Sequence, residues 1–311
     1  MRFIRRVAAG AVLAGVASCC MVAQNPNTIF YHTPDQQDES AATQGDASAH
    51  VRLGYRYLTG ATGTVDTTQA ARNFAAAAQK GSLASSAWLG YTYVTSPELG
   101  HQASEGIALI QNAASSGDPV AQTLLGHLQD LGTGVAQNHD AARTLFEGSA
   151  PVFALAQTYL GEWHVRSNTA QDYAIALQLF NAAAVQNDTR AMVDLAMLYV
   201  QGKGVQQDGA AARQWLAEAA KWGDLGAIFR QGYLYRHAPG KVNNPGRAVA
   251  LYQQAAARGY VPAEAALGMC YLWGLGVQKD VAQAVKWLSM AAPKDPFAAQ
   301  QLAAIKAQGG A

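Results

Sequence analysis

One short pattern of residues recurs seven times along this 311-residue chain. In most copies a small residue stands four positions before a leucine, another small residue follows the leucine directly, and a tyrosine stands four positions after it. The leucine positions of the seven copies, here called repeats one to seven, are Leu53, Leu89, Leu125, Leu155, Leu195, Gln231 and Leu267. The steps between them are 36, 36, 30, 40, 36 and 36 residues, so a deletion and an insertion nearly cancel. A period of this length indicates stacked two-helix units that bury their apolar faces only against one another.

The spacing within each repeat predicts two helices and no strand. Apolar positions follow a period of 3.6 residues, and the small residues lie near one helical face, where they let two backbones approach closely. A Gly-x-Gly-Val turn follows the first helix at residues 132–135, 202–205 and 274–277. The second helix then opens with side chains that suit an N-cap, at Asp66, Asn138, Asp208, Asn244 and Asp280. We therefore expect an all-α chain.

These repeats resemble the Sel1-like repeat, a relative of the tetratricopeptide repeat. Residues 191–208 give the closest copy, and the resemblance covers roughly residues 49–308. It implies a right-handed α/α superhelical solenoid whose first helices line a concave face, and an adaptor function. We expect repeats near residues 49–84, 85–120, 121–150, 151–190, 191–226, 227–262 and 263–295, followed by a capping helix at 296–308.

Repeats two and four depart most from the pattern. Residues 96–98 replace the glycine-rich turn in repeat two, and residues 162–170 lengthen the turn in repeat four. The join between repeats three and four, at residues 147–152, has lost part of a helix end. We expect a local change of superhelix curvature there.

The first residues have the composition of an export signal. Three arginines precede a run of about eleven apolar residues, which is too short to span a bilayer. Val16-Ala17-Ser18-Cys19 resembles a bacterial lipobox, which would make residues 1–18 a lipoprotein signal peptide and Cys19 the lipidated residue. Cys20 follows instead of an inner-membrane retention aspartate, so the resemblance implies an outer-membrane anchor facing the periplasm. We expect residues 19–48 to form a flexible tether; the alternative is a soluble periplasmic or secreted protein.

Charge and motif content argue against several classes of function. The formal net charge is +1, and no basic stripe suggests nucleic-acid binding. No nucleophile elbow, zinc-protease motif or phosphate-binding loop occurs, the seven histidines keep no ligand spacing, and we expect no cofactor, no metal and no catalysis. Some secreted relatives with a disulfide in each repeat are described as β-lactam hydrolases. This chain lacks the paired cysteines, and Cys270 is expected to be a small core residue.

The variable positions of the first helices are the candidate partner-binding face. The residue before the leucine position and the residue two after it share a helical face. Tryptophan, tyrosine and arginine dominate binding hot spots, and repeats one, two and six are rich in them at these positions. The candidates are Arg52, Tyr55, Trp88, Tyr91, Arg230 and Tyr233. The alternative is that the aromatic residues pack between repeats.

Three functions follow as hypotheses. The first is a protein–protein adaptor of the cell envelope that holds a partner in the concave face. The second is a glycan or peptidoglycan-fragment binder, in which Trp88 and Tyr91 stack on sugars. The third, implied only by the described relatives, is a hydrolase.

Overall fold

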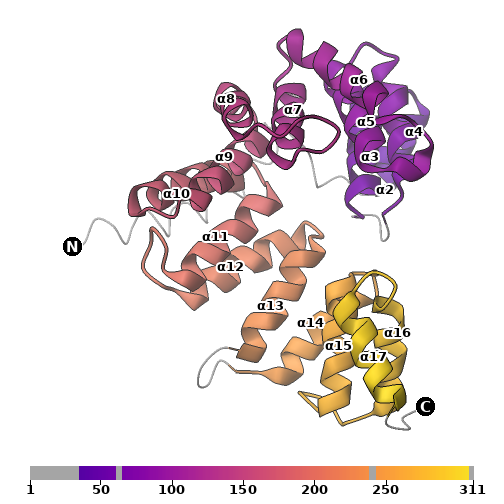
Figure 1. The fold of residues 1–311 in the computed structure, drawn as a ribbon, viewed down its shortest axis with the longest axis vertical. Coiled ribbons are helices and arrows are strands. Elements are labelled where there is room, and N and C mark those ends of the chain that lie inside the picture. The colour runs from indigo at the N-terminus through magenta and orange to yellow at the C-terminus, as the bar shows by residue number, and fades with distance from the viewer. Residues whose placement is uncertain (1–34, 61–64, 238–242, 308–311) are drawn as a thin grey trace. The chain divides into compact units, whose positions relative to one another are not determined.

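The computed structural model describes residues 35–60, 65–237 and 243–307. These residues form sixteen α-helices, one short 3-10 helix and no strand, so the predicted all-α class is confirmed (Figure 1). The helices are α2 (Asp35–Thr43), α3 (Ala47–Thr59), α4 (Thr67–Ala78), α5 (Leu83–Thr95), η2 (Pro97–Leu99), α6 (Ala103–Ser115), α7 (Pro119–Leu131), α8 (His139–Ser149), α9 (Ala154–Ser167), α10 (Ala170–Val185), α11 (Thr189–Gln201), α12 (Gly209–Lys221), α13 (Leu225–His237), α14 (Pro245–Ala256), α15 (Val261–Trp273), α16 (Val281–Ala291) and α17 (Pro296–Ala307).

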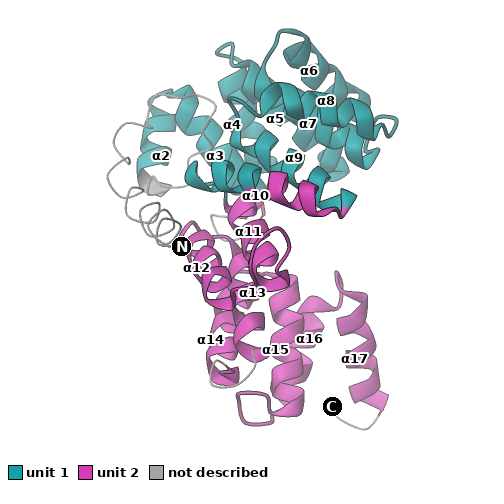
Figure 2. Cartoon of the chain, turned by 90° about the vertical axis from the view of Figure 1, so that its left-hand side faces the viewer, with its two compact units in different colours: residues 1–58, 67–167, 178–188 teal, residues 59–66, 168–177, 189–311 magenta. Residues whose placement is uncertain are grey.

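Helices α3 to α16 form seven consecutive pairs, one for each repeat, and α17 packs on α16. In the first and fourth pairs, Gly54 lies against the Phe74 ring and Gly161 against the Phe180 ring. The chain divides into two compact units, drawn in teal and magenta in Figure 2, and we describe each by itself. Unit 1 comprises residues 1–58, 67–167 and 178–188, and unit 2 comprises residues 59–66, 168–177 and 189–311. The boundary between the units therefore falls inside α10.

The small residue after each leucine position brings the two helices of a repeat together. A Cβ atom on Gly126 would lie 2.9 Å from the Phe146 ring, and one on Gly232 would lie 2.8 Å from the Tyr252 ring. Phe146 and Tyr252 are fully buried. The first helix therefore lies directly on the large apolar residue of the second helix, as the sequence pattern predicts.

Repeat two uses a glycine on both of its helices. A Cβ atom on Gly90 of α5 would lie 2.4 Å from the Gly106 carbonyl oxygen of α6, and the reciprocal distance is also 2.4 Å. The replaced turn forms η2, which ends at Gly100 with a φ of 76°. The departure at residues 96–98 therefore changes the connection and leaves the helix pair intact.

The structure corrects the predicted alignment of repeat four. A Cβ atom on Gly161 would lie 2.5 Å from the Phe180 ring, which repeats the contact of Gly126 with Phe146. The leucine position of repeat four is therefore Leu160, and the assignment to Leu155 is wrong. The steps of 30 and 40 residues become 35 and 35. Each is one residue short of 36, so the large deletion and insertion that we predicted do not exist.

The turns and caps between helices agree with the sequence pattern. Gly132, Gly134, Gly202, Gly204, Gly274 and Gly276 all have φ between 68° and 75°, a region that favours glycine. The side chains of Asn138, Asp208, Asn244 and Asp280 accept hydrogen bonds from the first backbone N–H groups of the following helices. Asp118 and Asp224 cap first helices in the same way.

The expected tether at residues 19–48 is wrong for its last part. Residues 35–43 form α2, and Asp38 of α2 is buried, with its carboxylate 2.7 Å from Arg52 and 3.6 Å from Arg56. A buried carboxylate needs such partners, and they anchor α2 to the first repeat. The predicted signal peptide and Cys19 lie outside the described residues.

The apolar face of repeat seven is covered at the end of the chain. Ala298 and Ile305 of α17 are buried in one cluster with Leu288 and Ala265. This is the arrangement that we expect of a solenoid cap. In the described part of the chain, every helix is too short or too polar to cross a membrane.

Candidate partner-binding face

With the corrected alignment, two rows of residues lie on the first-helix face. We use this term for the residue before the leucine position and the residue two after it in each repeat. The first row is Arg52, Trp88, Leu124, Tyr159, Asp194, Arg230 and Ala266. The second row is Tyr55, Tyr91, His127, Glu162, Met197, Tyr233 and Met269.

Trp88 is a packing residue in this structure. Its side chain is only 4% exposed. The ring stacks on Phe74 with centroids 5.9 Å apart and meets the edges of Tyr55 and Tyr91 at 5.3 and 5.7 Å. These three rings and the rest of the cluster bury Trp88 within unit 1, and Tyr55 and Tyr91 are partly buried against it.

An aromatic contact between the same positions occurs between repeats three and four. Tyr159 is 6% exposed and lies parallel to His127, with centroids 4.3 Å apart, and it also contacts Phe146 at 5.4 Å. A first-row residue thus covers the second-row residue and the second-helix ring of the preceding repeat. The sequence prediction missed Tyr159 because the alignment of repeat four was displaced by five residues.

Arg52 forms an ion pair inside unit 1. Its guanidinium lies 2.7 Å from the Asp38 carboxylate, and its side chain is 17% exposed. Of the six predicted residues, the four in repeats one and two therefore all have packing or ion-pair partners inside unit 1.

Repeat six, in unit 2, is different, because its two predicted partner-binding residues are exposed to solvent. Arg230 is exposed and Tyr233 is 50% exposed. His237 is also exposed, and its ring lies 4.1 Å from that of Tyr233. Residues 230, 233 and 237 are three and four positions apart, so they form one stripe along α13. Ala266 explains the exposure of Tyr233: it occupies the first-row position of the next repeat, where Trp88 and Tyr159 cover their neighbours.

Sequence reasoning overlooked His237. It lies outside the two rows that we considered, but its spacing of four from Tyr233 on a predicted helix could have indicated it. Burial and the nearby charge of Arg236 hold the pKa of His237 below its ordinary value, which favours the neutral ring.

The electrostatic character of repeat six is unusual. Residues 225–260 carry five basic residues and neither Asp nor Glu. Arg247 lies over the Tyr235 ring at 4.6 Å, and Arg258 donates to the Gly223 carbonyl oxygen at 3.3 Å. Burial raises the pKa of Tyr252 to about 12, although the charge of Arg236 opposes that shift. Residues 83–118 in repeat two show the opposite, with three acidic residues and neither Lys nor Arg.

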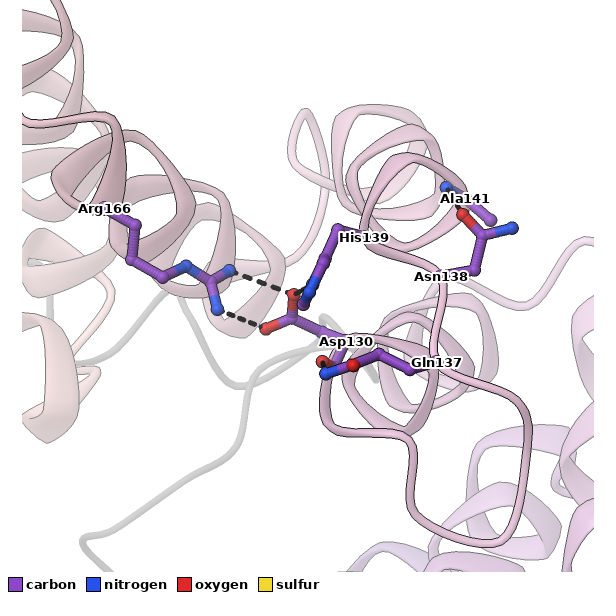
Figure 3. A network of polar contacts seen from close by, with 6 residues as sticks. All are labelled: Asp130, Gln137, Asn138, His139, Ala141 and Arg166. Atoms are coloured by element: carbon purple, nitrogen blue, oxygen red, sulfur yellow. Dashed lines mark hydrogen bonds and ion pairs between the residues drawn. The ribbon is translucent and has the colours of Figure 1, made fainter.

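A polar network joins repeats three and four within unit 1 (Figure 3). The buried Asp130 carboxylate at the end of α7 accepts two hydrogen bonds from Arg166, at 2.7 and 3.1 Å. His139 Nδ1 lies 2.8 Å from the same carboxylate, and Gln137 donates to the Asp130 backbone oxygen at 3.0 Å. Burial alone would raise the pKa of Asp130, but the hydrogen bonds and charges of Arg166 and His139 outweigh burial and lower it.

This network ties two repeats together and offers no obvious chemistry. It pairs one carboxylate with an arginine and a histidine, without a serine or cysteine nucleophile in the contacts around Asp130. No cluster of three or more His, Cys, Asp or Glu that could hold a metal occurs among the described residues. Cys270 is free and buried, as expected for a core residue, and burial raises the pKa of its thiol.

The sequence model of the Sel1 repeat matches residues 47–82, 119–150, 154–188, 189–224, 225–260 and 261–292. It leaves residues 83–118 unmatched, where α5 and α6 nevertheless form a packed pair. The match at 154–188 agrees with the corrected position of repeat four.

Relatives carry the same fold. A Sel1 repeat protein from Oxalobacter formigenes is 27% identical, with a TM-score of 0.56, over 70% of this chain and 87% of that one. Yeast Tom70 is 15% identical, with a TM-score of 0.56, over 90% of this chain and 62% of that one, and shows likeness of fold alone.

One curated relative is the Chitin synthase regulatory factor 3 of Schizosaccharomyces pombe, which is 29% identical over 187 residues. The match covers 56% of this chain and only 19% of that protein's length. Sel1 repeats of this kind support a protein-interaction scaffold, and proteins built from them are typically non-enzymatic. On its repeats and its helix-pair architecture, the chain belongs to the Sel1 repeat family.

Proposed function

We propose that this protein is an exported adaptor of the bacterial cell envelope, which binds a protein partner on its first-helix face. The observation that carries the proposal is the exposed pair Arg230 and Tyr233 on α13. Tyrosine and arginine supply much of the energy of protein interfaces, because they combine a large contact area with directed hydrogen bonds. Repeat six is therefore the main contact region in this proposal.

Repeats one and two have a smaller part in the proposal. Trp88 is covered by Phe74, Tyr55 and Tyr91, and Arg52 is paired with Asp38. Tyr55 and Tyr91 keep part of their surface accessible. They can contribute at the margin of an interface, whereas Trp88 would have to leave its cluster to touch a partner.

In-cell photo-crosslinking tests the proposal. A photoreactive residue at position 233 should capture one dominant protein, and one at position 91 should capture less of it. Position 254 is the control, because Gln254 is exposed on α14, the second helix of the same repeat. Equal capture of many proteins from positions 233 and 254, with the chain folded and exported, would contradict the proposal.

The envelope location is proposed on the sequence of residues 1–20. Export, followed by lipidation of Cys19, would attach the solenoid to the outer membrane on its periplasmic side. Palmitate labelling should mark the wild type and not the Cys19→Ala variant. If the wild type takes up no label, the protein is soluble in the periplasm or secreted, and the interaction proposal stands without the anchor.

The glycan-binding alternative loses its main support, because the ring of Trp88 is already buried. The hydrolase alternative gains none from the described residues, where the free thiol of Cys270 is buried. The yeast relative is named as a regulatory factor, which agrees with a binding protein. We therefore propose the adaptor alone.

A further inference from the structure

We infer that the stripe Arg230–Tyr233–His237 binds an acidic peptide segment that places an aromatic side chain over Tyr233. The inference rests on the proposed function, since it names the chemistry of the partner at the same face. It rests on an aromatic contact that occurs twice in unit 1, on repeat six, where the second-row ring and the second-helix ring are present and the covering residue is Ala266, and on the charge around that place.

The aromatic contact occurs at two places in unit 1. Trp88 covers Tyr55 and Phe74, and Tyr159 covers His127 and Phe146. In both cases a large aromatic first-row residue contacts the second-row ring and the second-helix ring of the preceding repeat: Trp88 stacks on Phe74 and meets Tyr55 edge to face, whereas Tyr159 stacks on His127 and is tilted against Phe146. Such aromatic pairs are worth about 0.5–1.5 kcal/mol beyond the area that they bury.

Repeat six has the second-row ring and the second-helix ring of this arrangement, but no aromatic first-row residue of repeat seven packs on them. Tyr233 is its second-row ring and Tyr252 is its second-helix ring, but Ala266 occupies the covering position in repeat seven. A methyl group cannot span a tyrosine ring, and Tyr233 is half exposed, with the His237 ring of its own helix 4.1 Å away. A partner's aromatic side chain can occupy this place and make the contact that Trp88 makes with Tyr55.

The charge beside Tyr233 determines which residues can flank the aromatic side chain of the partner. Arg230, one turn before Tyr233, is exposed and supplies the positive charge, whereas His237, one turn after Tyr233, is exposed and neutral and can donate a hydrogen bond. Helix α13 carries no acidic residue, and neither does the rest of residues 225–260; Asp224, directly before the helix, accepts a hydrogen bond from the Ala227 N–H as the helix cap. Carboxylates pair well with a guanidinium, which can donate two parallel hydrogen bonds. An acidic segment therefore fits this surface, and a basic one would be repelled.

The test uses the full-length chain and a fluorescein-labelled peptide, Glu-Glu-Ser-Phe-Glu-Glu, in fluorescence anisotropy titrations. We expect saturable binding, with a weaker complex at 300 mM than at 50 mM salt because exposed charges are screened. Replacing the peptide's Phe by Ala, or its Glu residues by Lys, should each weaken binding at least about tenfold. Equal binding of all three peptides would overturn the inference.

Variants of the protein locate the site. Tyr233→Ala and Arg230→Glu should each weaken binding at least about tenfold, the loss typical of an interface hot spot. Phe297→Ala is the matched control, because Phe297 on α17 is an equally exposed aromatic residue, at 51% against 50% for Tyr233. It should leave binding unchanged. Equal losses for Tyr233→Ala and Phe297→Ala would indicate unspecific adhesion and overturn the inference.

Ala266→Trp gives the sharpest test. It keeps every residue of the stripe and supplies, from within the chain, the cover that Trp88 provides in repeat two. We expect it to abolish peptide binding while the melting temperature is unchanged or higher. Wild-type binding by a folded Ala266→Trp variant would overturn the inference. If that variant does not fold, Tyr233→Ala and Arg230→Glu decide.

The outcome can be separated from that of the proposed function. Tyr233-dependent binding of phosphatidylglycerol vesicles or of a single-stranded oligonucleotide, without binding of the peptide, would overturn the peptide inference. A protein captured from position 233 together with no peptide binding would leave the adaptor standing and reject only this partner chemistry. Absence of any captured protein, with peptide binding intact, would instead count against the adaptor in the cell.

Discussion

At the scale of single residues, the neighbours of an aromatic side chain decide its role. Trp88 and Tyr233 come from equivalent helices and are both typical hot-spot residues, yet one is 4% and the other 50% exposed. Trp88 has Phe74 beneath it, whereas the position that would cover Tyr233 holds Ala266. The sequence identified both helices correctly, and it could not weigh these contacts because they join different repeats.

Replacing Trp88 by alanine should therefore act on stability. Removing a buried tryptophan leaves a cavity among Phe74, Tyr55 and Tyr91, and we expect a loss of about 3–5 kcal/mol in the free energy of unfolding. Tyr233→Ala should change it by less than about 1 kcal/mol, because that side chain is half exposed. Urea denaturation followed by circular dichroism measures both. Similar losses in the two variants would contradict the assignment of roles.

The Asp130 carboxylate should make stability depend on pH. Its pKa in the folded chain is below the ordinary 3.8, so its contribution is fully present above pH 3.8 and is lost as the pH falls through the folded value. We expect Asp130→Asn to lower the free energy of unfolding by on the order of 1 kcal/mol at pH 7. The loss is small for a buried carboxylate because water screens the half-exposed Arg166. Urea melts at pH 7, 5, 4 and 3 should show this difference shrinking only at the lowest pH. A difference that stays constant down to pH 3 would argue against the ion pair.

At the scale of helices and repeats, the sequence predicted the pairing and missed one alignment. The period, the caps and the Gly-x-Gly turns follow from local spacing, which is why they were predictable. Repeat four offers two small-residue patterns five positions apart, around Leu155 and Leu160. The contact between Gly161 and Phe180, on different helices, identifies Leu160, and the more even steps of 35 and 35 residues agree with it. With Leu155 as the leucine position, the first-helix face of repeat four consists of Ala154 and Gln157. With Leu160, it consists of Tyr159 and Glu162.

Repeat two provides a prediction about helix packing. Gly106→Ala adds a Cβ atom that would lie 2.4 Å from the Gly90 carbonyl oxygen, so α5 and α6 must move apart. We expect a loss of about 1–3 kcal/mol in the free energy of unfolding. Gly148→Ala in α8 is the matched control, because nothing lies within 4 Å of its added Cβ atom.

The control should be neutral or stabilising by up to about 1 kcal/mol, since alanine favours a helix over glycine. Denaturant unfolding of both variants under one condition gives the comparison. A Gly106→Ala variant as stable as Gly148→Ala would mean that the two helices of repeat two do not approach as closely as described.

At the scale of the whole molecule, the two units differ in charge. Unit 1, counted without residues 1–34, which hold three arginines, carries 6 basic and 12 acidic residues, a balance of −6. Residues 59–66, 168–177 and 189–311 carry 13 basic and 9 acidic residues, a balance of +4. The net charge of the chain conceals this contrast. A cationic second unit with an uncovered tyrosine agrees with the proposal that the acidic partner binds to repeat six.

A solenoid also depends on what covers its last repeat. Ile305 of α17 is 7% exposed and lies in one cluster with Leu288, Ala291 and Ala265. Ile305→Ser removes apolar contact and introduces a buried hydroxyl, so we expect a loss of about 2–4 kcal/mol. The freed face of repeat seven would be apolar and exposed, which favours association between molecules. Light scattering during heating should detect particles at a lower temperature than in the wild type.

Lys306→Ser, at an exposed neighbouring position, should change neither stability nor scattering. If the two variants behave alike, α17 is not the cap of the solenoid.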